Sequence, residues 1–263
     1  MFKNNETQHF NKYAQELNLN KVKINATFNS KLREGKFFLK HLPNSMKGKQ
    51  ILDIGCGVGA TSIYFAKKGA KVTGIDISPG MIKKAFALAR IHNAKILIFK
   101  TADAENLDYP DNNFDIIMGK AILHHINIAK AVKETHRVLR PGGLALFSEP
   151  FAYNPLVKIY DKFASCGLRS KGEKRLNLND IKIIQRTFKK VEWLGIDIST
   201  FILFILDFLY LKFTRSKVPI NWFERVEYGE VLNSSYNLFD KIDGILPKPI
   251  QALGWKIVIV CRK

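Results

Sequence analysis

The sequence predicts an α/β fold in which helices cover both faces of a mostly parallel, seven-stranded sheet. Between Gln50 and Pro150, short apolar runs alternate with stretches of helical periodicity, a pattern typical of parallel strands joined by crossover helices. Two further strand-like runs follow near the end of the chain. Since 46% of the 263 residues are hydrophobic, the chain can bury a full core, and a disordered protein is excluded.

The strands of the central region are predicted by five apolar runs bounded by glycine, aspartate or proline. In chain order they read QILDIG, KVTGID, KILIFK, FDIIMG and LALFSE. The helices between them have recognisable ends. TSIYFAKKG ends at Gly69, the next helix begins with Ser78 as N-cap and Pro79 at its first position, and IAKAVKETHRVLRPGG is expected to stop at Pro141.

The flanking regions suggest three parts of the chain. Residues 1–45 are expected to form an N-terminal helical cap and residues 46–150 the ligand-binding core. Residues 151–263 are expected to supply substrate-side helices, a strand over 191–199, an apolar helical insertion over 200–252 and a final strand over 254–262.

The composition limits the partners and the compartment. A net charge of +19 attracts anions such as a membrane surface, nucleic acid or a phosphorylated substrate, although a lysine-rich surface without a specific partner explains it equally well. Three widely separated cysteines show no metal or disulfide spacing, which favours a reducing compartment and no metal site. The polar opening MFKNNETQHFNKYAQ predicts no signal peptide, so we expect a cytoplasmic protein.

The stretch ILDIGCGVGA, residues 51–60, predicts a ligand-binding loop after the first strand. Glycines let backbone N–H groups approach a ligand, and the following helix directs its N-terminus at it. Gly55, Gly57 and Ala60 also fit the pattern of dinucleotide-binding enzymes. However, Asp53 beside the loop would repel a pyrophosphate and suits a cationic ligand. Asp76, which ends the second strand, can accept both hydroxyls of a ribose.

Three segments of the core together resemble the class I S-adenosylmethionine-dependent methyltransferases. They read ILDIGCGVGATSIYFAKKGAKVTGIDIS, TADAENLDYPDNNFDIIMGKAILHHI and RVLRPGGLALFSEP. The resemblance covers roughly residues 45–150 and is nearest to the branch that includes quinone and sterol methyltransferases. It implies a Rossmann-like fold and S-adenosyl-L-methionine as cofactor.

The resemblance also assigns cofactor-binding residues. It implies that the loop residues and Asp53 surround the methionine half, that Asp76 binds the ribose, that Ile77 packs on the adenine and that Asp103 meets the adenine amine. Tyr13 belongs to HFNKYAQ, which loosely resembles a family segment that closes over the cofactor. The full predicted set is Tyr13, Asp53, Gly55, Cys56, Gly57, Gly59, Asp76, Ile77, Met81, Asp103, Ala104, Lys120 and Ala121.

Two histidines after the fourth strand are the candidate catalytic residues. Active-site loops emerge at this point of the fold, so His124 or His125 could act as a general base. Loop packing and substrate contact are the alternatives for both. Glu149, at the end of the fifth strand, either contacts the substrate or caps the strand. Methyl transfer itself requires mainly in-line alignment and exclusion of water, because the sulfonium is already an activated donor.

The sequence therefore predicts a methyltransferase that acts on a small, lipophilic or anionic acceptor. One alternative is an RNA or DNA methyltransferase. Enzymes that methylate base amino groups typically carry [ND]-P-P-[YF] after the fourth strand, where this chain has GKAILHH. The other alternative is a non-catalytic cofactor-binding protein. The acceptor, the choice among O-, N- and C-methylation and the oligomeric state stay open.

A second apolar feature, FILFILDFLYLKF within residues 198–213, is unexplained by cofactor binding. It is too short for a membrane-spanning helix and carries a central aspartate. Basic residues flank it on both sides. The segment is predicted either to pack as a buried helix or dimer face, or to rest on the anionic inner face of a membrane as a peripheral contact.

Overall fold

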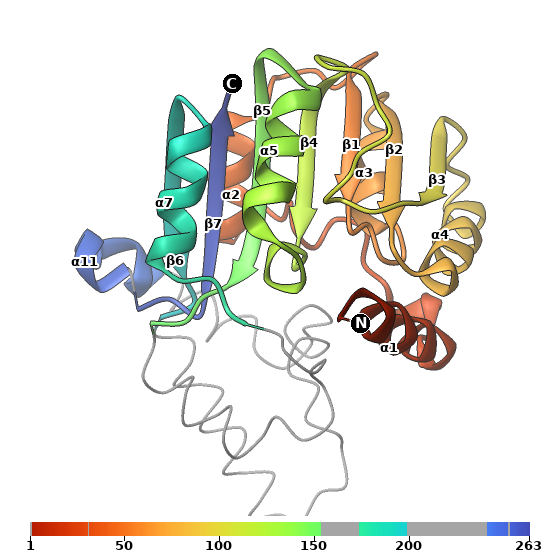
Figure 1. The fold of residues 1–263 in the computed structure, drawn as a ribbon, viewed down its shortest axis with the longest axis horizontal. Coiled ribbons are helices and arrows are strands. Elements are labelled where there is room, and N and C mark those ends of the chain that lie inside the picture. Colours follow the sequence, from red (N-terminus) through yellow and green to blue (C-terminus); the bar gives the residue numbers. More distant parts are fainter. Residues whose placement is uncertain (1, 31, 154–173, 199–240, 252) are drawn as a thin grey trace, which may run out of the picture.

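The computed structural model describes residues 2–30, 32–153, 174–198, 241–251 and 253–263. Seven strands form one sheet in the order β3-β2-β1-β4-β5-β7-β6 (Figure 1). β7 runs antiparallel to both of its neighbours, β5 and β6, and the pairs from β3 to β5 are parallel. The predicted α/β fold is confirmed. The strands are β1 Gln50–Ile54, β2 Lys71–Asp76, β3 Leu97–Thr101, β4 Phe114–Lys120, β5 Leu139–Pro150, β6 Lys190–Ile196 and β7 Lys256–Arg262.

Helices lie on both faces of the sheet (Figure 1). Those that flank the strands are α2 Arg33–His41, α3 Ala60–Lys67, α4 Pro79–Ile91, α5 Ile128–Val138 and α7 Leu178–Thr187, with the short α11 Lys248–Gln251 near the end. The alternation of side chains along β1 shows how the core is divided. Leu52 packs into the cluster that α5 and α7 cover, whereas Ile51 packs into the cluster that contains Phe38 of α2 and Phe65 of α3.

Helix α4 begins as the sequence predicts. The Ser78 hydroxyl accepts a hydrogen bond from the Met81 N–H at 3.1 Å, and Pro79 occupies the first helical position. This cap satisfies one of the N–H groups that the first turn leaves without an intrahelical partner. The capped end lies directly after β2, so it fixes where α4 starts relative to the end of that strand.

Three predicted boundaries are wrong. The α5 helix ends at Val138 rather than at Pro141, and β5 begins at Leu139. β6 ends at Ile196 rather than at residue 199, because Asp197 has a left-handed φ of 61° and cannot continue an extended strand. β7 begins at Lys256 rather than at residue 254, because the Gly254 N–H donates to the Gln251 carbonyl at 3.1 Å in the turn before the strand.

The N-terminal region contains α1 Phe2–Glu16, a 3-10 turn at Leu19–Lys21 and α2. α1 lies beneath the carboxyl ends of the central strands in Figure 1. The apolar segment 198–213 lies outside the described residues except for Ile198. None of the helices in the described ranges combines the length and the apolar character that crossing a bilayer requires.

Candidate functional site

The predicted glycine loop forms a tight turn between β1 and α3. Gly55, Gly57 and Gly59 all have positive φ, at 62°, 53° and 79°, a region that favours glycine. They differ in what surrounds them. A side chain at Gly55 would collide with Ile122 and one at Gly59 with Phe99, but a Cβ at Gly57 would meet no atom within 4 Å. The loop backbone at Gly57 therefore borders open space that a ligand can occupy.

Asp76, at the end of β2, holds this loop in place. One carboxylate oxygen accepts a hydrogen bond from the Gly57 N–H at 2.9 Å, and the other accepts one from the Ser78 N–H at 2.9 Å. Burial raises the pKa of Asp76, and these backbone hydrogen bonds oppose that shift. The side chain thus links the glycine loop to the first turn of α4. Its remaining lone pairs are suited to the two ribose hydroxyls predicted from the sequence.

Asp103 follows β3 at the same edge of the sheet. One of its oxygens accepts from the Glu105 N–H at 2.9 Å, and the other pairs with the Lys3 ammonium at 2.5 Å. Lys3 also pairs with Glu105 at 3.0 Å. Burial lowers the pKa of Lys3, but the bonds to the two carboxylates raise it by more than burial lowers it. The pKa of Lys3 therefore lies above its ordinary value. A lysine of α1 therefore pairs with the carboxylate that was predicted to meet the adenine amine.

Asp53 lies deeper than the other two aspartates. It is 3% exposed and accepts a hydrogen bond from the Ser62 hydroxyl of α3 at 2.6 Å. Burial raises the pKa of Asp53 to about 7, with a further contribution from the nearby Asp76. A carboxyl with this pKa is only partly ionised at neutral pH. It therefore repels a pyrophosphate less than the sequence alone implied.

Helix α1 closes the site by contacts with three separate strand ends. The side-chain oxygen of Asn11 accepts from the Ser78 hydroxyl at 2.7 Å and from the Gly80 N–H at 2.9 Å. Glu6 pairs with Nδ1 of His125 at 3.1 Å, and the Phe10 ring packs edge-on against the His125 ring. Tyr13 lies on the same helix, half-buried. The helix is thus joined to the loops after β2, β3 and β4.

The loop after β4 brings both candidate histidines to the site. Nδ1 of His124 lies 2.7 Å from a carboxylate oxygen of Glu149, at the end of β5. The other oxygen of Glu149 accepts from the N–H groups of Ile122 and Leu123 at 2.9 Å each. Because a carboxylate oxygen accepts, a neutral His124 in this contact carries its proton on Nδ1.

The remaining predicted residues lie in the loops after β1 to β4 and in the first turn of α4. Ala121 has a positive φ of 53° and follows the half-buried Lys120 directly. Ile77 is half-buried, and Met81 and Ala104 are buried. Cys56 is also half-buried, and burial raises the pKa of its thiol, so it is a poor nucleophile.

The structure brings the predicted residues to the carboxyl ends of β1 to β4, where open α/β sheets bind their ligands. Sequence analysis assigned no role to Lys3, Glu6, Asn11 or Ser62, and left open whether Glu149 contacts substrate. The partners of Lys3, Glu6 and Asn11 are distant in sequence, and no local spacing marks any of these residues. Within the described ranges, no cluster of three or more His, Cys, Asp or Glu side chains is placed to hold a metal ion.

Comparison with known proteins agrees with this geometry. Residues 52–147 match the family described as "Methyltransferase domain". The chain is 39% identical over 109 residues to phosphoethanolamine N-methyltransferase 1 of Zea mays, covering 40% of this chain and 21% of that protein. It is 34% identical over 106 residues to malonyl-[acyl-carrier protein] O-methyltransferase of Serratia marcescens, covering 40% of each. The chain thus spans well under half the length of both relatives.

A solved structure extends the fold comparison beyond the core. Phosphoethanolamine N-methyltransferase 2 of Haemonchus contortus, in complex with S-adenosyl-L-methionine, superposes with a TM-score of 0.59 at 20% identity. The match covers 87% of this chain and 51% of that one. At this identity the likeness shows the fold.

The fold and the site geometry together describe an α/β domain with a glycine loop at the carboxyl edge of a sheet that helices cover on both faces. Its core, residues 52–147, matches the methyltransferase-domain family, and its fold is the Rossmann-like fold of the class I S-adenosylmethionine-dependent methyltransferases.

Proposed function

We propose that this protein transfers the methyl group of S-adenosylmethionine to a small acceptor that enters beside the loops after β4 and β5. The observation that carries the proposal is the open space at Gly57, bordered by a loop that Asp76 anchors. A ligand there would meet backbone N–H groups and the N-terminus of α3. Asp76 and Asp103 would hold its ribose and adenine, and the loop together with Lys120 and Ala121 would surround its methionine part.

The cofactor supplies an activated methyl group, so the residues of the chain are required mainly to align the acceptor and exclude water. α1 is placed to exclude water, since it contacts the loops after β2, β3 and β4. His124, oriented by the buried Glu149, is the side chain best suited to take a proton from an acceptor that must lose one. His125, paired with Glu6, is better suited to holding α1 in place.

The chemical class of the acceptor is a finer proposal. The relatives named above act, by name, on phosphoethanolamine and on a malonyl group held by a carrier protein, and one is an N- and the other an O-methyltransferase. We favour a small acceptor that is lipophilic or anionic, because the net charge is +19 and segment 198–213 is strongly apolar. We also propose that segment 198–213 contacts the inner face of a membrane. If this contact exists, the double variant Phe204→Glu with Phe208→Glu should bind vesicles more weakly than wild type.

The test of the proposed function uses two matched glycine substitutions in the full chain. Gly57 and Gly142 both have positive φ, and neither would place a Cβ within 4 Å of another atom. Their replacement by valine therefore imposes a similar backbone strain, but only Gly57→Val fills the ligand space. Methyl transfer from labelled S-adenosylmethionine into a small-molecule and lipid extract should be lost in Gly57→Val and kept in Gly142→Val.

Two results would oppose the proposal. If wild-type protein transfers the label to RNA and not to small acceptors, it is a nucleic-acid methyltransferase. If it binds the cofactor and transfers the methyl group to neither, it is a cofactor-binding protein without this activity.

A further inference from the structure

The exposed edge of the sheet carries a group of large apolar side chains that the cofactor site does not use. Phe86, Ile91, Ile96 and Ile98 are 46%, 54%, 58% and 54% exposed. They come from α4, from the turn after it and from β3, the strand at one end of the sheet order. These four side chains and the cations around them are called the α4–β3 surface below.

The exposure of these residues follows from how the edge is built. Phe99 of β3 is buried against Ile82 and Ala85 of α4 and Ile63 of α3. The alternate residues of the strand, Ile98 and Lys100, point to the other side of the sheet and are exposed. Phe86 is half exposed although its ring packs on the Phe99 ring in a T-shaped pair, with centroids 5.4 Å apart. The apolar group therefore wraps around the edge of the sheet from both sides.

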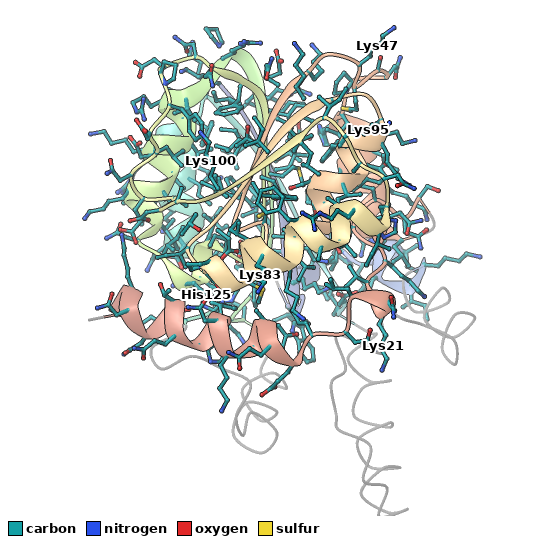
Figure 2. All side chains as sticks on the ribbon, turned by 90° about the vertical axis from the view of Figure 1, so that its right-hand side faces the viewer. Lys21, Lys47, Lys83, Lys95, Lys100 and His125 are labelled. Carbon is teal, nitrogen blue, oxygen red and sulfur yellow. The ribbon has the colours of Figure 1, made fainter. Side chains whose placement is uncertain are left out.

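The charged side chains of the segment that forms α4 and β3 are all basic. The 24-residue segment from Ser78 to Thr101 contains five Lys and Arg residues and no Asp or Glu. Lys84 donates to the Leu17 carbonyl, and the four other cations are exposed: Lys83, Arg90, Lys95 and Lys100. Figure 2 shows Lys83, Lys95 and Lys100 on the same side of the molecule, around α4 and β3.

A hollow joins the apolar and the basic parts of the α4–β3 surface. It has a volume of about 360 Å³ and is lined by Phe86, Leu97 and Phe99 together with Arg90 and Lys95, among others. An apolar recess with two cations beside it matches an amphipathic anion, whose charged group meets the cations while its hydrocarbon part enters the recess.

We propose that the α4–β3 surface docks on a bilayer that contains anionic lipid. The isoleucines would enter the interface between headgroups and acyl chains, and the lysines would contact lipid phosphates. A second copy of this chain fits poorly, because two such surfaces would bring eight exposed cations together. Nucleic acid fits less well than lipid, because single-strand binding relies on aromatic stacking, and three of the four exposed apolar side chains are isoleucines.

This inference is independent of the acceptor and of segment 198–213. It predicts that the full chain sediments with vesicles of phosphatidylcholine and phosphatidylglycerol at low salt, but not with phosphatidylcholine alone. Since each basic residue near an anionic surface contributes roughly a fivefold factor, Lys95→Gln with Lys100→Gln should weaken binding about 25-fold. Ile96→Ser with Ile98→Ser should weaken it as well, without any change in charge.

Matched controls separate the surface from net charge. Lys36 and Lys40 are exposed on α2, and replacing both by glutamine removes the same charge elsewhere; binding should change less than twofold. Glutamate at Phe204 and Phe208 should leave binding through the α4–β3 surface in place. Circular dichroism melting checks that each variant is folded.

The proposal is overturned if the Lys95 and Lys100 variant and the Lys36 and Lys40 variant lose the same vesicle affinity, since net charge alone then drives binding. It is also overturned if the Ile96 and Ile98 variant binds vesicles like wild type, because the lysines then only protect an edge strand from pairing. Loss of binding in the Phe204 and Phe208 variant, with the Lys95 and Lys100 variant unchanged, would assign the membrane contact to segment 198–213 instead.

Discussion

Glu149 orients the His124 ring, because one of its buried carboxylate oxygens lies 2.7 Å from Nδ1. Even so, we expect His124→Ala and His125→Ala each to retain measurable turnover, because the sulfonium donor needs little acid–base assistance. Turnover with saturating cofactor, compared between the two variants, measures this. A loss near the upper end of the roughly 10²–10⁴-fold range typical of general acid–base catalysis, confined to His124→Ala, would make His124 a catalytic base.

Asp53 gives the stability of the fold a defined pH dependence. Burial raises its pKa from 3.8 to about 7 in the folded protein, so the folded state binds its proton more tightly than the unfolded state does. The resulting stabilisation is fully present below about pH 4 and is lost as the pH rises through about 7. Asp53→Asn removes this dependence, because an amide does not titrate.

The measurement for Asp53 is the free energy of unfolding by urea at several pH values for wild type and Asp53→Asn. Wild type should lose stability relative to the variant between about pH 4 and pH 7 and stay level above that range. The difference between the two proteins removes the contribution of groups that do not interact with Asp53. A constant difference across the range would mean that Asp53 titrates normally in the folded protein.

Helix α1 links cofactor binding to an ion pair. The Lys3 ammonium occupies Asp103, the carboxylate predicted to bind the adenine amine, so cofactor binding must displace or share this contact. Lys3→Met should therefore raise the affinity for S-adenosylmethionine by a factor of roughly 1.5 to 5, the scale of a partly exposed ion pair. Titration calorimetry measures it, with the exposed Lys12 of the same helix replaced by methionine as control.

A fall in affinity for Lys3→Met would contradict this reasoning and show that Lys3 supports the closed position of α1 instead. Equal affinities for wild type and both variants would show that Asp103 does not contact the cofactor.

The elements that sequence reasoning predicted are those specified by neighbouring residues. Ser78 and Pro79 start α4 because capping is a local interaction, and the apolar runs of β1, β2 and β4 are long enough to identify buried strands. The placement of β7 between β5 and β6 depends on pairing with a strand more than a hundred residues earlier and with another at least 60 residues earlier. The end of β6 at Asp197 depends on a single dihedral angle.

The same difference between local and long-range interactions applies to the site residues. The positions of Gly57 and Asp76 could be predicted from the sequence, because Asp76 ends β2 and Gly57 belongs to the loop that follows β1. The pairs Lys3–Asp103 and Glu6–His125 join residues about 100 or more positions apart, and only the folded position of α1 brings them together. The rise of the Asp53 pKa comes from burial, which the sequence indicates only as a strand position.

At the scale of the whole molecule, the site lies across the ends of β1 to β4, so a ligand there contacts loops that separate on unfolding. The correct ligand should therefore stabilise the entire sheet. A ligand at about 100 times its dissociation constant contributes about 2.7 kcal/mol. For a domain of this size that corresponds to a rise of roughly 5–10 °C in the melting temperature.

Thermal melting with S-adenosylhomocysteine and with NAD tests whether the glycine loop is an S-adenosylmethionine site or a dinucleotide site. Both contain an adenosine that could reach Asp76 and Asp103, but NAD adds a pyrophosphate beside Asp76 and the partly ionised Asp53. We expect the full rise with S-adenosylhomocysteine and a shift below about 1 °C with NAD at the same concentration. Asp76→Ala should abolish the rise, because the anchor of the Gly57 loop and the proposed ribose partner are lost together. Stabilisation by NAD alone would instead make this loop a dinucleotide site.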